Sequence, residues 1–180
     1  MEDEINAPNE TLSKWHIVNA GLVIIHPFLP QLFKSLEYLD DMGQFKNEEL
    51  QFRAVYLLHY VATGQNSGVN ETELAISKIF SGMLIEVPIP LDLVLSEKEK
   101  GIAIELLTVL IDRWEKLGNT SLEGLQNTFL KRSGLVEYKN RAYQLSVETS
   151  GTDILLDFIP WSINIIKLPW VKQIIYSSWR

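Results

Sequence analysis

The feature that most constrains the fold is an uncharged, mainly apolar stretch that runs from Trp15 to Phe33. Its length approaches that of a membrane-spanning helix. Pro27 and Pro30 lie inside it, however, and each disrupts backbone hydrogen bonding that a bilayer cannot replace. The sequence therefore predicts that this stretch is buried in the core of a folded domain.

The size and charge of the chain restrict its class. Its 180 residues suffice for one domain, and its content of 46% hydrophobic and 22% charged residues is typical of a globular protein. A formal net charge of −7 disfavours binding to nucleic acids and anionic membranes. The chain contains no cysteine, which excludes disulfides and thiolate sites and suits a reducing cytoplasm.

The N-terminus begins Met-Glu-Asp-Glu, which has the wrong charge for a secretory signal peptide. We expect residues 1–13 to form a flexible acidic leader. Residues 14–180 are predicted to form a single globular domain, since no linker divides them.

Helical periodicity and capping residues predict most of the secondary structure. A helix is expected over residues 47–63, ended by Gly64. Ser96 followed by Glu99 forms a capping box, which predicts the longest amphipathic helix, running to about Leu117. Other helices are expected at 28–39, at 70–83 behind an Asn70 cap and from Thr120 towards Gly134, with a helical turn at 153–158 and either a helix or a strand at 17–25.

The spacing of apolar residues changes near the C-terminus. Residues 135–148 alternate between apolar and polar side chains, which predicts a β-hairpin that turns near Lys139 and Asn140. Residues 163–168 are predicted to form a third strand, whose end Pro169 confines to a sheet edge. The predicted fold class is therefore mainly α (α+β), with about six helices around one core and a small antiparallel hairpin or sheet near the C-terminus.

No motif predicts a catalytic, cofactor or metal site. The three histidines lack metal-ligand spacing, and the nucleotide-binding and hydrolase motifs are absent. A hydrolase would have to be assembled from scattered carboxylates, which are better explained as surface and capping residues. These carboxylates are Glu105, Asp112, Glu123, Asp153 and Asp157.

The last twenty residues are rich in aromatic side chains. Trp161, Trp170, Tyr176 and Trp179 lie among aliphatic residues, and such residues serve as anchors both in cores and at interfaces. One interpretation is that this segment seals the core of the domain. The other is that part of it, around residues 176–179, is an exposed docking surface, and we take these four residues as the candidate partner-docking residues.

Two phrases near the ends of the chain carry a family resemblance. They are HIVNAGLVIIHPFLP at residues 16–30 and IPWSINIIKLPW at residues 159–170, with RAVYLLHYVATG at 53–64 and WEKLGNTSLEGL at 114–125 between them. In this order the phrases resemble the C-terminal region of the tape measure proteins of contractile injection systems. They contain turn glycines, caps and apolar positions and carry no catalytic signature.

The resemblance implies a non-enzymatic assembly role in a phage-tail-like particle. It implies protein partners, namely tail tube, baseplate or initiator components or other copies of the chain, without nucleic acid or membrane insertion. It also implies assembly in the bacterial cytoplasm, followed by incorporation into the particle.

Tape measure proteins are generally much longer than this chain, and a compact domain of this size has a radius of gyration of only about 16 Å. We therefore expect the chain to be an anchoring module of a longer ruler, a short relative or a fragment. The alternative is a free-standing cytoplasmic adaptor or regulatory domain.

Overall fold

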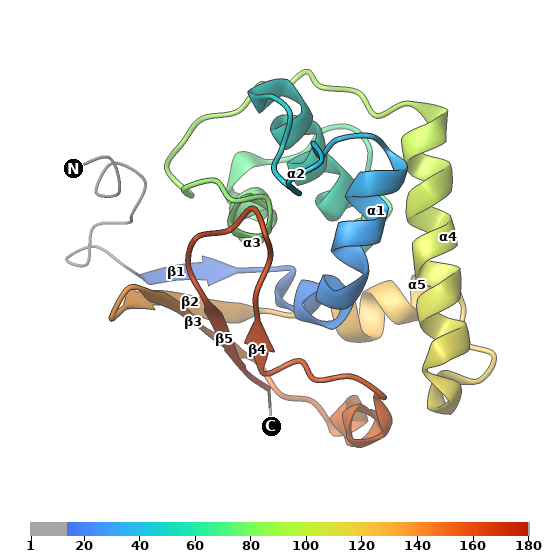
Figure 1. Cartoon of the computed structure of the whole chain (residues 1–180). Helices are drawn as coiled ribbons and strands as arrows, with labels where there is room; N and C mark the ends of the chain where they lie inside the picture. The colour runs from blue at the N-terminus through green and yellow to red at the C-terminus, as the bar shows by residue number, and fades with distance from the viewer. Residues whose placement is uncertain (1–13, 180) are drawn as a thin grey trace.

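In the computed structural model, which describes residues 14–179, helices gather on one side of a mixed five-stranded sheet (Figure 1). The helices are η3 (Ala20–Phe28), α1 (Leu29–Ser35), α2 (Glu48–Thr63), η4 (Glu71–Leu74), α3 (Ala75–Phe80), α4 (Glu97–Arg113), η5 (Glu115–Leu117), α5 (Leu122–Leu125), η6 (Gln126–Leu130) and η7 (Gly151–Phe158). The strands are β1 (Lys14–Ile17), β2 (Gly134–Lys139), β3 (Ala142–Val147), β4 (Ile165–Ile166) and β5 (Ile175–Ser178). The predicted α+β class is confirmed.

The uncharged N-terminal stretch lies in the core, as predicted. It forms residues 15–17 of β1, the 3₁₀ helix η3, whose residues 20–25 are all buried, and most of α1. Gly21 allows η3 to pack directly against the backbone of η6, because a Cβ atom there would lie 1.8 Å from the carbonyl oxygen of Phe129. None of the helices between residues 14 and 179 combines the length and apolar character that crossing a bilayer requires.

The two longest helices, α2 and α4, begin where the sequence predicts them, but α4 ends at Arg113 instead of near Leu117, and residues 115–117 form the separate η5. Asn47 accepts a hydrogen bond from the Leu50 amide at 2.9 Å and begins α2, and Gly64 ends that helix with a φ of 71°. At the start of α4, the Glu99 amide donates to Ser96 Oγ at 3.2 Å, and the Ser96 amide donates to Glu99 Oε2 at 2.6 Å. This reciprocal pair is the predicted capping box.

Other helices differ in detail from the predictions. The helix expected at 28–39 ends at Ser35, because Glu37 has a φ of 59°, a conformation that no helix can include. The predicted cap at Thr120 is wrong: the Thr120 hydroxyl donates to a backbone carbonyl, and Ser121 Oγ accepts the Gly124 amide at 3.0 Å to begin α5. The helix expected at 70–83 divides into η4 and α3, and Asn70 caps its first turn.

The sheet is larger than the predicted hairpin. Its strand order is β1-β2-β3-β5-β4, in which β3 and β5 are parallel and the other pairs are antiparallel. The hairpin of β2 and β3 turns at Asn140 and Arg141, whose φ angles of 55° and 60° are those of a type I′ turn. The strand expected at 163–168 is reduced to β4, while β1 and β5 come from segments that were not predicted as strands.

Candidate docking site

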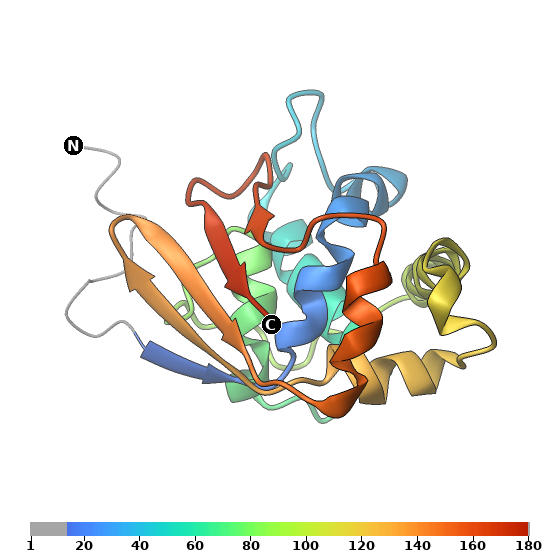
Figure 2. The same cartoon turned by 90° about the horizontal axis from the view of Figure 1, so that it is seen from below.

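The five strands present one face to the helices and leave the other uncovered (Figure 2). We call the uncovered side the outer face and define it by the strand side chains that alternate away from the helical layer. These are Lys14, His16, Leu135, Glu137, Lys139, Ala142, Gln144, Ser146, Ile165, Tyr176 and Ser178. All of them except Ala142 are exposed or half-buried, whereas the strand residues between them pack mainly into the core.

The exposed apolar part of the outer face is formed by Tyr176 and Ile165, whereas Leu135 is half-buried. These residues are register partners on β5 and β4, and 38% of Tyr176 and 53% of Ile165 is exposed. Side chains directly opposite each other on one face of a sheet are in contact range. Gln144 pairs with Tyr176 on its other side, so the apolar pair has a polar margin there. An apolar centre with a polar rim is the usual composition of a protein interface.

The rim carries a charged pair at the opposite side of the outer face. Lys14 Nζ lies 2.6 Å from Glu137 Oε1, and the lysine side chain is 72% exposed. The hydrogen bond from Lys14 lowers the pKa of Glu137, which keeps the carboxylate charged. An exposed pair of this kind contributes little to stability and remains available to a partner.

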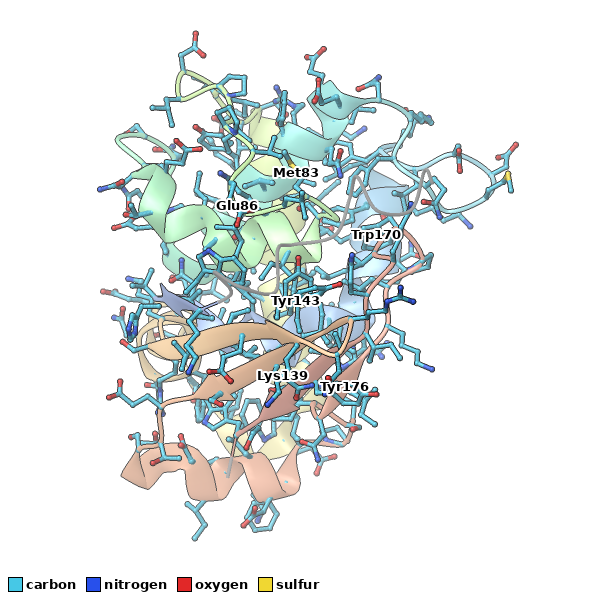
Figure 3. The ribbon with its side chains drawn as sticks, turned by 90° about the vertical axis from the view of Figure 1, so that its left-hand side faces the viewer. Met83, Glu86, Lys139, Tyr143, Trp170 and Tyr176 are labelled. Atoms are coloured by element: carbon cyan, nitrogen blue, oxygen red, sulfur yellow. The ribbon has the colours of Figure 1, made fainter. Side chains whose placement is uncertain are left out.

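Trp170 lies inside the molecule rather than on the outer face. It is 7% exposed, its indole N–H donates to the Phe80 carbonyl at 2.8 Å, and its ring packs edge-on against Phe33 and Phe45. These contacts join the loop between β4 and β5 to α3 and to the N-terminal helices. Figure 3 shows Trp170 beside the helical layer. Trp170 therefore holds the C-terminal segment against the core.

Trp179 and Trp161 border one pocket of about 290 Å³ at the other end of the segment. Trp179 is 4% exposed and donates its indole N–H to the buried Asp153 carboxylate at 3.0 Å. Arg132 binds the other oxygen of that carboxylate at 2.6 Å and lies over the Trp179 ring. Half-buried Trp161 donates its indole N–H to the Ile24 carbonyl at 2.9 Å. The structure thus brings Trp161 and Trp179 together at one pocket. Trp170 is buried elsewhere, and Tyr176 lies on the outer face.

The residues that the sequence could not identify for this site are Ile165 and the β1 side chains. Ile165 becomes part of the site only through its register with Tyr176, and β1 joins the sheet from the opposite end of the chain. The sequence gives little signal for β5, because the alternation of Ile175–Ser178 between buried and exposed positions is seen only in the folded chain.

The scattered carboxylates are divided between α4, α5 and η7, and exposed Asp157 on η7 lines the pocket beside Trp179. Asp153 is bound by Arg132 and Trp179, whereas Glu105 and Asp112 are exposed on α4 and Glu123 is exposed on α5. Within residues 14–179 no group of three His, Asp or Glu side chains is arranged to hold a metal ion.

A family model described as contractile injection system tape measure protein matches residues 2–179. No curated protein and no solved structure matches the chain.

Proposed function

Because the chain belongs to the family of contractile injection system tape measure proteins, we propose that it is a non-enzymatic module that attaches the tape measure to another particle protein. The proposed attachment surface is the outer face, centred on Tyr176 and Ile165. The observation that carries the proposal is the pairing of these two exposed apolar side chains on neighbouring strands of a largely polar face. The proposed partner is a tail tube, baseplate or initiator component, met in the bacterial cytoplasm during assembly.

The rigidity of the outer face supports this proposal. Both residues belong to hydrogen-bonded strands, so little backbone entropy would be lost when a partner binds. Tyrosine is also enriched among residues that dominate binding energies, because its large ring loses few rotamers on burial.

The buried tryptophans support the proposal in a different way. Trp170 and Trp179 fix the two sides of the segment that contains β5, through hydrogen bonds to the Phe80 carbonyl and the Asp153 carboxylate. In this proposal they position the docking surface, and Tyr176 makes the contact. Half-buried Trp161 lies next to β4 in sequence and can contribute at the margin.

The test is capture of the co-encoded tube, baseplate and initiator proteins by the tagged full chain. Tyr176→Ser combined with Ile165→Thr is expected to weaken capture at least about tenfold, since anchor residues contribute roughly 1–2 kcal/mol each. The matched control is Ile154→Thr with Phe158→Ser, which removes two exposed apolar side chains from η7, 60% and 51% exposed respectively.

The possible results of this test lead to different conclusions. Loss of capture in the outer-face variant alone, with unchanged circular dichroism, supports it. Undiminished capture, or equal loss in both variants, refutes the assignment to the outer face. Capture of a partner that never enters the particle would instead favour a free-standing adaptor, and self-association would identify another copy as the partner.

A further inference from the structure

A second surface with a defined chemistry lies at the other edge of the sheet. A pocket of about 510 Å³ opens between β1, the beginning of α3 and the loop that follows α3. It is lined by Trp15, His16, Glu71, Lys78 and Glu86, together with Thr72 and three apolar residues. Figure 3 shows Glu86 on the helical side of the sheet, above Tyr143.

Lys78 builds the wall of this pocket and is fully engaged. Its side chain is 2% exposed, and Nζ donates to Glu71 Oε1 at 2.8 Å, to the Ile85 carbonyl at 3.0 Å and to the Val87 carbonyl at 2.7 Å. An ammonium group has three N–H donors, so these three acceptors use all of them. Lys78 therefore fastens the loop to α3 and has no donor left for a ligand.

The charges that remain favour a cation. Glu71 and Glu86 both border the pocket, and Lys78 can neutralise only one of them. Among residues 14–179 no cation pairs with Glu86. The half-buried indole of Trp15 supplies an aromatic surface beside these carboxylates, and aromatic faces attract ammonium and guanidinium groups.

The strand beside the pocket has an open edge. β1 stands at one end of the strand order, and no other strand in the described part of the chain pairs with its outer side (Figure 2). In an antiparallel strand, alternate residues direct their N–H and C=O groups away from the neighbour, so an edge strand can accept a further strand. The pocket and this edge share Trp15 and His16.

We propose that the β1 edge binds an extended segment of a partner protein and that the pocket receives a lysine or arginine side chain of that segment. The segment pairs with the free backbone groups of β1, while its cationic group lies near the Glu86 carboxylate and the Trp15 ring. The net charge of −7 favours a basic partner over a second copy of the chain. This contact is separate from the outer-face attachment and adds a second point of binding.

The proposal is tested with an acetylated and amidated pentapeptide, Val-Thr-Lys-Thr-Val, titrated into the full chain. The tryptophan indole signals are followed by NMR. The lysine peptide and its arginine analogue are expected to shift the Trp15 signal, and the neutral norleucine analogue to bind at least about tenfold more weakly, or about 1.4 kcal/mol. Added salt should weaken the binding of the two cationic peptides.

Two variants with the same charge change locate the binding. Glu86→Gln should weaken the affinity for the lysine peptide several-fold. Glu105→Gln, on the exposed side of α4, should leave that affinity unchanged. Slower exchange of β1 amides on binding should accompany the effect. The proposal would be overturned if the norleucine peptide bound as tightly as the lysine peptide, or if Glu86→Gln bound the lysine peptide as tightly as the wild type. It would also be overturned if no peptide bound. The assay contains no tube, baseplate or initiator protein and does not test binding at Tyr176, so such a result leaves the Tyr176 attachment standing.

Discussion

Glu99→Gln should be among the most damaging conservative substitutions in this protein. The Glu99 carboxylate is 5% exposed and accepts hydrogen bonds from Arg53, from the Tyr38 hydroxyl and from the Ser96 amide. Arg53 binds both carboxylate oxygens, at 2.6 and 2.5 Å. The group joins the first turn of α4 to α2 and to the chain after α1. Glutamine retains the shape but removes the negative charge that Arg53 faces.

Two independent arguments give a similar magnitude for the stability lost in Glu99→Gln. Burial by itself would raise the pKa of Glu99, but the hydrogen bonds from Arg53, Tyr38 and Ser96 lower it to about 2, against an ordinary value of 4.5. That difference corresponds to about 3 kcal/mol at neutral pH. Breaking one side of a buried ion pair costs about 3–5 kcal/mol in other proteins. We expect Glu99→Gln to lower the free energy of unfolding by about 3 kcal/mol.

The pH dependence of this loss has a definite sign. The lowered pKa means that the contribution of Glu99 is fully present above about pH 5 and is lost as pH falls through 4.5 towards 2, because the unfolded chain binds the proton first. The difference between wild type and Glu99→Gln should therefore shrink by about 2 kcal/mol between pH 6 and pH 3.

Urea unfolding followed by circular dichroism at several pH values measures both quantities. The matched control is Glu97→Gln, two residues away on the same helix, where a 92% exposed side chain forms an ion pair with Lys100 at 2.8 Å. That change should cost less than about 1 kcal/mol. Equal losses in the two variants, or a Glu99→Gln loss that does not depend on pH, would refute the reasoning.

Three further predictions concern buried or closely packed positions and are read from unfolding curves. Gly21→Ala should cost more than about 3 kcal/mol, because its Cβ would lie 1.8 Å from a backbone oxygen, whereas Gly101→Ala on α4 has no heavy atom within 4 Å and should stabilise by about 0.5–1 kcal/mol. Burial lowers the pKa of His59, so the free energy of unfolding should fall as pH drops below 6.5. His59→Gln should make that free energy less dependent on pH between pH 8 and 5. Trp179→Phe removes a donor from a buried carboxylate and should cost about 1.5–3 kcal/mol, more than Trp161→Phe, which loses a bond to a neutral carbonyl.

The elements that could be predicted from the sequence are those specified by neighbouring residues. α2 and α4 have an amphipathic period and side-chain caps within three residues of their first turns, at Asn47 and Ser96. The β2–β3 hairpin combines alternation with Asn140, which tolerates the left-handed turn. In these cases local chemistry and tertiary packing favour the same structure.

The remaining strands depend on partners that lie far away in the sequence. β1 is held by β2, about 120 residues later, and β5 is parallel to β3 and enters the sheet between β3 and β4. Four-residue strands carry too little alternation to be distinguished from loops without those neighbours.

The roles of the aromatic residues were undetermined for a similar reason. Trp170, Trp179 and Tyr176 have comparable sequence surroundings, yet the first two lie under other elements and the third lies on an uncovered face. Burial is set by what covers a residue in three dimensions, so the choice between core and interface required the structure. The docking role itself remains a prediction.

The most direct test of the anchoring role is site-specific photo-crosslinking in assembled particles. A photoreactive phenylalanine analogue replaces Tyr176 in one sample and Phe158, which is 51% exposed on η7, in another. Crosslinks from position 176 to a tube, baseplate or initiator protein, together with markedly fewer from position 158, are the predicted result. Particles that contain the protein but give no crosslink from position 176, or the same crosslinks from both positions, would contradict attachment through the outer face.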